Sequence, residues 1–162
     1  MECEDITKER FREVSGLWAT GVSIITTVDL QGQPYGLTMN SVTSLSLEPP
    51  MFLVCVDSLS DTLNPLLESK VFCINILSKT QQGLSNTFAK KGDNKFEDLI
   101  WSSGKTKAPI IDESVVYIEC EVDKVYEGGD HKIICGRTVF MKKNEDSLEP
   151  LVYFMGKYRD IV

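Results

Sequence analysis

The chain has 162 residues, of which 42% are hydrophobic and 25% charged, with a net charge of −7. These values are ordinary for a globular protein and leave room for a sizeable core in one domain spanning residues 1–162. The acidic balance, without a cluster of Lys and Arg, argues against a nucleic-acid partner. No apolar run approaches the roughly 20 residues that a membrane helix needs, and the acidic first residues do not resemble a secretory signal. We therefore expect no membrane partner.

The five cysteines indicate a reducing compartment, so we expect a cytoplasmic protein. Four of them lie in apolar strand-like runs, where a free thiol acts as a small hydrophobic group. The odd count, the absence of a Cys-x-x-Cys pair and the single histidine leave no zinc or iron–sulfur ligand set, so no metal site is predicted.

The predicted elements are mostly strands. Thr7 is expected to cap a helix whose apolar positions Phe11, Val14 and Trp18 fall at helical spacing. Ser60 or Asp61 is expected to cap a second, short helix, and Ser78 a third over 79–89, with one helical turn over 96–101. The predicted strands cover 22–28, a Ser/Thr-rich stretch within 36–48, 51–57, 71–77, a half-exposed strand over 114–123, 131–141 and 151–154.

Two pairs of these strands are expected to form hairpins, through the turns 29–33 and 127–130. The helices are too few for a doubly wound parallel sheet. The pattern favours a mainly β protein, a closed or nearly closed antiparallel barrel with two or three peripheral helices.

The Ser/Thr-rich stretch carries short neutral side chains where a surface strand normally carries Lys or Glu. Such groups can line a site for a flat, polar-edged ligand that bears a phosphate, although an edge strand of a β-sandwich is the alternative. They are Thr38, Asn40, Ser41, Thr43, Ser44 and Ser46, ahead of the pair Pro49-Pro50.

Three further places could carry chemistry. His131, the only histidine, follows two glycines and Asp130, and opens a strand or stands at the mouth of a site. Lys95, with the nearby lysines 90 and 91, could bind a phosphate, or these lysines could only interact with the negative end of a helix dipole. Tyr158 and its cationic neighbours could reach a ligand or a second subunit. A hydrolase is disfavoured, because there is no Gly-x-Ser-x-Gly motif and no second histidine.

Seven motifs occur in order between residues 11 and 158. They are Ala19-Thr20-Gly21-Val22, Gly36-x-Thr38-x-Asn40-Ser41-Val42-x-Ser44-x-Ser46-x-x-Pro49-Pro50, Phe72-x-Ile74-Asn75-Ile76-Leu77, Gln81-x-x-Leu84-Ser85-x-x-Phe88-Ala89, Lys95-Phe96, Gly129-Asp130-His131-x-Ile133-x-x-Gly136-Arg137 and Pro150-Leu151-x-Tyr153-Phe154-x-Gly156-x-Tyr158. Together they resemble the flavin reductase family, the NAD(P)H-dependent flavin oxidoreductases that supply reduced flavin to two-component monooxygenases.

The resemblance implies a six-stranded antiparallel split barrel of Greek-key order, a homodimer, and FMN or FAD in a groove near the subunit interface. It implies NAD(P)H as the hydride donor and an oxygenase component as a partner. His131 is the implied catalytic residue, near the nicotinamide or the flavin. The implied cofactor-binding residues are Thr38, Met39, Asn40, Ser41, Val42, Thr43, Ser44, Ser46, Val56, Asp57, Ser58, Ser85, Phe88, Lys95 and Tyr158.

Two of these positions depart from the family pattern. Lys95 stands where an arginine is frequent, which keeps the charge but loses the bidentate fork, and Val42 stands where phenylalanine is frequent. Hydride transfer needs stacked rings and excluded water, so short hydroxyls and one histidine suffice without a nucleophile or metal. The alternatives are a flavin-binding electron-transfer protein reduced by a protein donor, a split-barrel protein that binds haem or pyridoxine phosphate, and a purely structural barrel.

Overall fold

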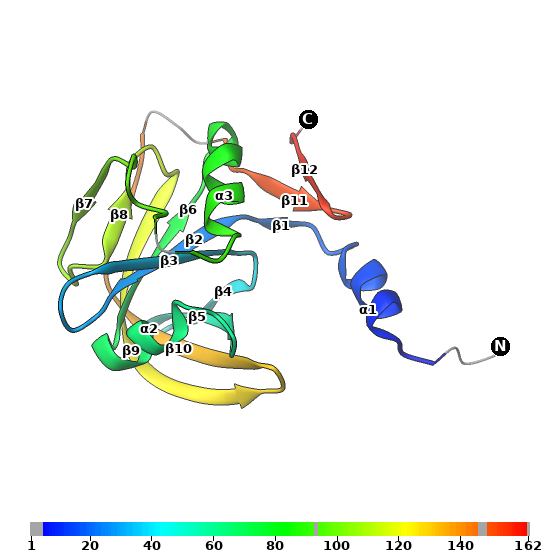
Figure 1. Ribbon diagram of the computed structural model, residues 1–162, viewed down its shortest axis with the longest axis horizontal. Helices are drawn as coiled ribbons and strands as arrows, with labels where there is room; N and C mark the ends of the chain where they lie inside the picture. Colours follow the sequence, from blue (N-terminus) through cyan, green and yellow to red (C-terminus); the bar gives the residue numbers. More distant parts are fainter. Residues whose placement is uncertain (1–4, 93, 146–148, 162) are drawn as a thin grey trace.

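The computed structural model describes residues 5–92, 94–145 and 149–161, and its architecture is mainly β (Figure 1). Three short α-helices and one 3₁₀ turn accompany the strands: α1 (Lys8–Ser15), α2 (Leu63–Ser69), η1 (Lys79–Gln81) and α3 (Gln82–Phe88). The strands are β1 (Thr20–Gly21), β2 (Ser23–Val28), β3 (Pro34–Met39), β4 (Val42–Leu47), β5 (Pro50–Asp57), β6 (Val71–Ile76), β7 (Trp101–Ser103), β8 (Pro109–Ile111), β9 (Val116–Gly128), β10 (His131–Lys143), β11 (Val152–Phe154) and β12 (Lys157–Arg159).

The main sheet is antiparallel and has seven strands in the order β3-β2-β6-β9-β10-β5-β4. The strands β1, β11 and β12 form a second sheet, and β7 pairs with β8 in a third. Both predicted hairpins are present. The carboxylate of Asp29 accepts hydrogen bonds from the backbone of Gln31 and Gln33 in the first turn, and Gly129 adopts a φ of 73° in the second.

The prediction of a six-stranded barrel is wrong in strand number and in closure. The main sheet has seven strands, and its edge strands β3 and β4 do not pair with each other. Only Asn40 and Ser41 connect them, so the Cα atoms of Met39 and Val42 are about 11 Å apart at most. The sheet must therefore curl until its two edges approach, although no ladder of hydrogen bonds closes it.

The Ser/Thr-rich stretch, predicted as one strand, is two strands on opposite edges of the sheet. Residues of β3 pair with β2, whereas those of β4 pair with β5. The crossing is fixed at Ser41, whose carbonyl accepts from Cys55 N and whose hydroxyl donates to Cys55 O, at 3.1 and 3.0 Å. These bonds tie the crossing to β5.

The core lies inside the curled sheet and beneath α2 and α3. One cluster joins Phe72, Ile74, Val54 and Leu66 with their neighbours from five strands and α2. A second cluster packs Phe88 of α3 on Ile24, Leu77 and Leu151. No helix in the described part of the chain is long and apolar enough to span a membrane.

The predicted half-exposed strand is longer than expected and more buried. Glu119, expected on the wet face of β9, is only 1% exposed because β7, β8 and the loop between them cover it. Its carboxylate accepts hydrogen bonds from the backbone N–H and hydroxyl of Thr106 at 2.7 and 2.8 Å. The alternation of apolar and polar residues along one strand cannot show that a hairpin from elsewhere in the chain covers the polar face of that strand.

The helix predictions are correct in part. Thr7 caps α1, where its hydroxyl accepts from Arg10 N at 3.1 Å, but the helix ends at Ser15 and none of its residues is buried. Thr62, not Ser60 or Asp61, precedes α2. Ser78 forms the expected capping box, although the first turn after it is 3₁₀. The remaining differences lie late in the chain. Trp101 opens β7 instead of ending a helical turn, and the last predicted strand, 151–154, is β11, which pairs with a further strand, β12, that the prediction lacked.

Candidate functional site

Three of the predicted site segments meet at one edge of the main sheet. Asp57 at the end of β5 lies opposite His131 at the start of β10, and Cys55, two residues earlier, lies opposite Ile133. On the other side of β5, Ser41 is bonded to Cys55. Neighbouring strands are about 4.8 Å apart, and Ser41 and His131 are also offset by two residues along β5, so they are separated by ~12 Å.

His131 is held by the turn that precedes it. The pKa of Asp130 is lowered by the hydrogen bond and charge of His131, so its carboxylate is ionised and accepts from Nδ1–H at 2.7 Å. The carbonyl of Asp130 in turn accepts from Ser58 N at 3.0 Å, and Asp57 Oδ1 accepts from Leu59 N at 2.8 Å. With Nδ1 occupied, Nε2 is the nitrogen that remains for a ligand.

A second group of predicted residues meets where α3 packs on β3 and β12. The hydroxyl of Thr38 donates to the carbonyl of Ser85 at 2.7 Å. The Ser85 hydroxyl lies 2.9 Å from that of Tyr158, which donates to Asn86 Oδ1 at 3.0 Å. Sequence reasoning missed Asn86, although its place next to Ser85 on a short helix was a usable signal.

Lys95 lies beside this second group. Its ammonium donates to the carbonyl of Gly36 at 3.0 Å and lies 6.0 Å from the centre of the Phe88 ring. A Cβ at Gly36 would lie 2.8 Å from that ring, so the close packing requires glycine. Lys95 also lines a cavity of about 120 Å³, the space of about four water molecules. Such a cavity suits a phosphate-sized group rather than a flavin ring.

The remaining predicted residues divide between the core and the surface. Met39, Val56 and Phe88 are at most 8% exposed and belong to the two core clusters. Their side chains therefore shape the site from beneath. The polar residues of the crossing and of β4 are exposed or half-buried, as a binding wall requires: Asn40, Ser41, Thr43, Ser44 and Ser46.

The two faces of β4 and β5 differ. Val42 and Val54 are register partners that face the core, whereas Thr43 and Leu53 are partners on the outer face. Strand alternation places Ser41, Asp57 and His131 on this same outer face. Among the described residues, the substantial contacts of β4 and β5 are with neighbouring strands and not with a helix, which leaves this face open. Sequence reasoning missed this open face.

The side chains of β4 are polar or apolar without charge, and the charged groups described near this edge include Asp57, the Asp130–His131 pair and Lys91, whose ammonium donates to Leu59 O at 3.2 Å. No group of three or more His, Cys, Asp or Glu residues in the described ranges is arranged to hold a metal ion. The short hydroxyls of β4 can bind the polar edge of a flat ligand, and His131 can hold or accept a proton at Nε2.

Comparison with known proteins identifies the family of this chain. The family model described as the flavin reductase like domain matches residues 15–162. The chain belongs to the flavin reductase family. It is 37% identical over 158 residues to a protein of Rhizobium meliloti (strain 1021) named Probable flavin reductase, covering 98% of this chain but only 50% of that protein. It is 35% identical to the flavin-dependent monooxygenase reductase subunit HsaB of Rhodococcus jostii (strain RHA1), covering 98% and 80%.

Solved flavin reductases have the same fold. The structure of a homologue of nitrilotriacetate monooxygenase component B from Mycobacterium thermoresistibile matches with a TM-score of 0.92 at 36% identity, covering 96% of this chain and 87% of that one. The NADH:FAD oxidoreductase SgcE6 of Streptomyces globisporus C-1027 also matches with a TM-score of 0.92, at 30% identity, covering 100% and 98%. A second SgcE6 structure is a complex with NAD and FAD fragments.

Proposed function

We propose that this protein is an NAD(P)H-dependent flavin reductase that transfers a hydride to FMN or FAD. The observation that carries the proposal is the meeting of Ser41, Asp57 and His131 at one edge of an open sheet face in a member of the flavin reductase family. The relatives named for NADH:FAD oxidoreduction and for monooxygenase reductase subunits support the same activity.

The residues at this edge fit a flavin. No side chain of β4 is charged, and its hydroxyls are short enough to leave room for a flat ring above them. Ser41, Thr43 and the exposed backbone of the crossing would hold the polar edge of the ring, and Lys95 or Ser85 the phosphate side. When bound, the flavin accepts a hydride from the dihydronicotinamide.

The chain's own residues orient the reactants. Val42, Val54 and Met39 give the site a rigid apolar floor, which keeps the ring plane fixed. Asp130 holds Nδ1 of His131 at 2.7 Å, which leaves Nε2 for a ligand. His131 is therefore a positioning and polarising residue that contacts the nicotinamide, rather than an obligatory proton donor.

The proposal extends to the context in which the protein works. We place it in the cytoplasm, as a homodimer with a split-barrel domain, supplying reduced flavin to an oxygenase component. The relatives that are reductase subunits of monooxygenases support the oxygenase partner. The four cysteines described are free thiols, which suits a reducing compartment.

A reductase assay tests the proposal. Purified protein is mixed with NADH or NADPH and, in turn, with FMN, FAD or riboflavin, and nicotinamide oxidation is followed by absorbance. We expect turnover with at least one pair of substrates and saturation in both. A protein that retains flavin through desalting but oxidises no nicotinamide is instead an electron carrier reduced by a protein donor. A protein that binds no flavin at all contradicts the proposal.

A further inference from the structure

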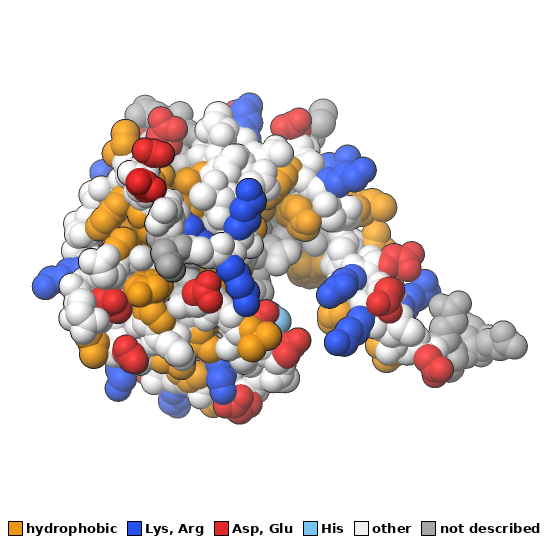
Figure 2. Space-filling view, in the orientation of Figure 1, with side chains coloured by type: hydrophobic (Ala, Val, Ile, Leu, Met, Phe, Trp, Pro, Cys, Tyr) orange, Lys and Arg blue, Asp and Glu red, His pale blue; other side chains and the backbone are white. Residues whose placement is uncertain are grey.

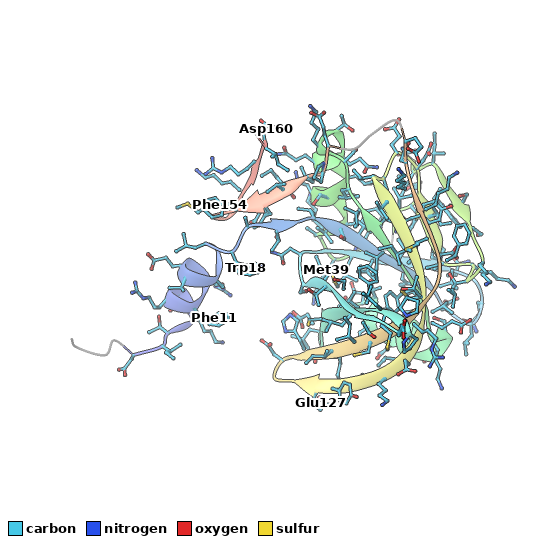
Figure 3. The ribbon with its side chains drawn as sticks, turned by 180° about the vertical axis from the view of Figure 1, so that it is seen from behind. Phe11, Trp18, Met39, Glu127, Phe154 and Asp160 are labelled. Atoms are coloured by element: carbon cyan, nitrogen blue, oxygen red, sulfur yellow. The ribbon has the colours of Figure 1, made fainter. Side chains whose placement is uncertain are left out.

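A further cavity lies where the β7–β8 hairpin meets the start of β9 and the end of β10. Its volume is about 610 Å³, within the range of sites that bind small molecules. Strand β10 runs from His131, at the proposed flavin site, to Lys143 in the cavity lining, over about 40 Å of strand. Figure 3 shows this separation, with Glu127 at the hairpin end of β9, away from β7 and β8. The cavity is therefore distinct from the proposed flavin site.

Part of the cavity lining is apolar and firmly packed. Ile110 and Ile111 of β8 are 9% and 1% exposed, and Trp101 of β7 and Tyr117 of β9 are half-buried. The ring of Tyr117 stacks on that of Phe140, with the ring centres 6.0 Å apart and an angle of 27° between the planes. Aromatic rings together with buried aliphatic side chains suit an apolar ligand body of about one ring.

One buried polar group in the lining lacks a partner. Ser114 is 5% exposed, and its hydroxyl makes no hydrogen bond to any described residue. The backbone on both sides is anchored: Gln81 Nε2 donates to Asp112 O at 2.8 Å, and Val115 N donates to Ile76 O at the same distance. Buried hydroxyls are nearly always paired, because an unpaired one is unfavourable. The Ser114 hydroxyl rotates about one torsion, so a polar group that enters the cavity can pair with it.

The charges of the lining favour a cation. Lys143 and Glu145 form an ion pair at 3.2 Å. Among the described lining residues, this leaves the carboxylates of Asp112 and Glu113 against the ammonium of Lys142. Figure 2 shows Asp and Glu side chains beside hydrophobic ones at the end of the molecule where β7 and β8 lie. The net charge of −7 also attracts cations. Carboxylates and aromatic faces both bind an ammonium group.

We propose that this cavity binds a small organic cation, an ammonium group on an apolar body of about one ring. Asp112 and Glu113 bind the ammonium group, which also donates to the unpaired hydroxyl of Ser114. The apolar body packs on Trp101 and the isoleucines of β8. An anion of the same shape would meet an excess of carboxylates. The inference goes beyond the proposed function and does not depend on it, because the cavity shares no residue with the proposed flavin site.

A matched set of ligands tests the inference. Phenethylamine, phenethyl alcohol and hydrocinnamate each carry one phenyl ring and differ in charge. The variant Trp18→Phe leaves Trp101, which lines the cavity, as the only tryptophan, and its fluorescence is followed as each ligand is added to flavin-free protein at neutral pH. We expect saturation with the amine, a dissociation constant about tenfold higher for the alcohol, and no saturation with the carboxylate.

Variants of the lining separate the charge from the hydroxyl. Asp112→Asn with Glu113→Gln should raise the dissociation constant of the amine about tenfold and leave that of the alcohol unchanged. The matched control, Glu68→Gln with Glu121→Gln, changes the net charge equally at two exposed residues outside the cavity and should leave both constants unchanged. Ser114→Ala should raise the constant of the amine about threefold without lowering the melting temperature, because its hydroxyl has no bond within the described chain to lose.

Several outcomes overturn the inference. They are no saturation with the amine, equal affinity for the amine and the alcohol, and a loss in the control variant as large as in the Asp112 and Glu113 variant. Displacement of the amine by FMN in equilibrium dialysis also overturns it, because the amine would then occupy the flavin site. A Ser114→Ala protein that melts at a lower temperature and binds the amine normally shows that the hydroxyl serves the fold. The wild-type reductase assay reports separately on the proposed function.

Discussion

The part of the main sheet that β7 and β8 cover and the open part at β4 and β5 use their polar side chains differently. In the covered half, Asn75 of β6 is fully buried, and its amide donates to Ile24 O at 3.2 Å and Thr26 Oγ1 at 3.1 Å and accepts from Ile111 N at 2.8 Å. In the open half, the side chains of Asp57 and His131 bond to the turns beside them, to Leu59 N and to Asp130. Polar side chains in the covered part are therefore occupied by hydrogen bonds within the protein, whereas those in the open part are available to a ligand.

The difference shows how this chain separates stability from function. Buried polar groups must find partners within the protein: Ile111 of β8 is one partner of Asn75, and Thr106 in the loop between β7 and β8 is the partner of Glu119. In the part of the chain that the structure describes, β4 and β5 make no comparable contacts with a covering layer, so their outer side chains can meet a ligand or another subunit. Substitutions in the two halves should therefore affect different measurements.

The largest expected effect is on stability in the covered half. Asn75→Ala removes the acceptor of Ile111 N and two donated bonds, and should lower the free energy of unfolding by about 3 kcal/mol. Asn64→Ala, on an exposed position of α2, is the matched control and should stay within about 0.5 kcal/mol. Urea denaturation measures both. The comparison fails if Thr43→Ala, on the open face, is as destabilising as Asn75→Ala.

The covered half should also lose stability in alkali. Burial raises the pKa of Cys120 to about 12, and burial together with the charge of Glu119 raises that of Cys73 further. Each thiol has a higher pKa in the folded chain than the value of 9.0 in the unfolded chain. Its contribution to stability is therefore fully present below pH 9 and is lost as the pH rises toward the pKa of the folded chain. Unfolding free energy should fall above pH 9, by up to ~1.4 kcal/mol per pH unit for each thiol.

Cysteine variants identify the source of that slope. Cys73→Ala and Cys120→Ala should each flatten the alkaline loss, whereas Cys55→Ala, on the half-buried outer face, should change it less. Chemical denaturation at a series of pH values gives the slopes. An unchanged slope in both buried-thiol variants would assign the alkaline loss to other groups.

The sequence predicted most strands and the family, because alternation, turn residues and spaced motifs are local signals. It missed the division of the Ser/Thr-rich stretch between two edges, since the crossing at Ser41 depends on the curl of the whole sheet. It placed Glu119 in water because the hairpin that covers it comes from elsewhere in the chain. It included His131 and Asp57 among the expected site residues only through the resemblance. The register that puts them opposite each other cannot be derived from either residue alone.

The open half should respond in catalysis rather than in stability. His131→Ala should raise KM for the nicotinamide about tenfold, equivalent to ~1.4 kcal/mol, while the flavin dissociation constant changes less than about twofold. Asp130→Asn keeps the side-chain volume but weakens the anchor of Nδ1, and should give an intermediate KM. Steady-state kinetics and flavin titration separate the two constants. Equal losses for both ligands would contradict the assignment of His131 to the nicotinamide.

The smallest expected effect tests the boundary between the halves, at Tyr158. Tyr158→Phe removes the hydroxyl that contacts Ser85 and Asn86 but keeps the ring that packs edge-on against Tyr153, 5.4 Å away. If this group orients Thr38 for the flavin, affinity should fall about threefold, or ~0.7 kcal/mol. Tyr153→Phe is the matched control and should leave affinity unchanged. If Tyr158→Phe instead lowers the melting temperature and leaves flavin binding intact, the contact serves the fold, and the functional surface stops at the β4–β5 edge.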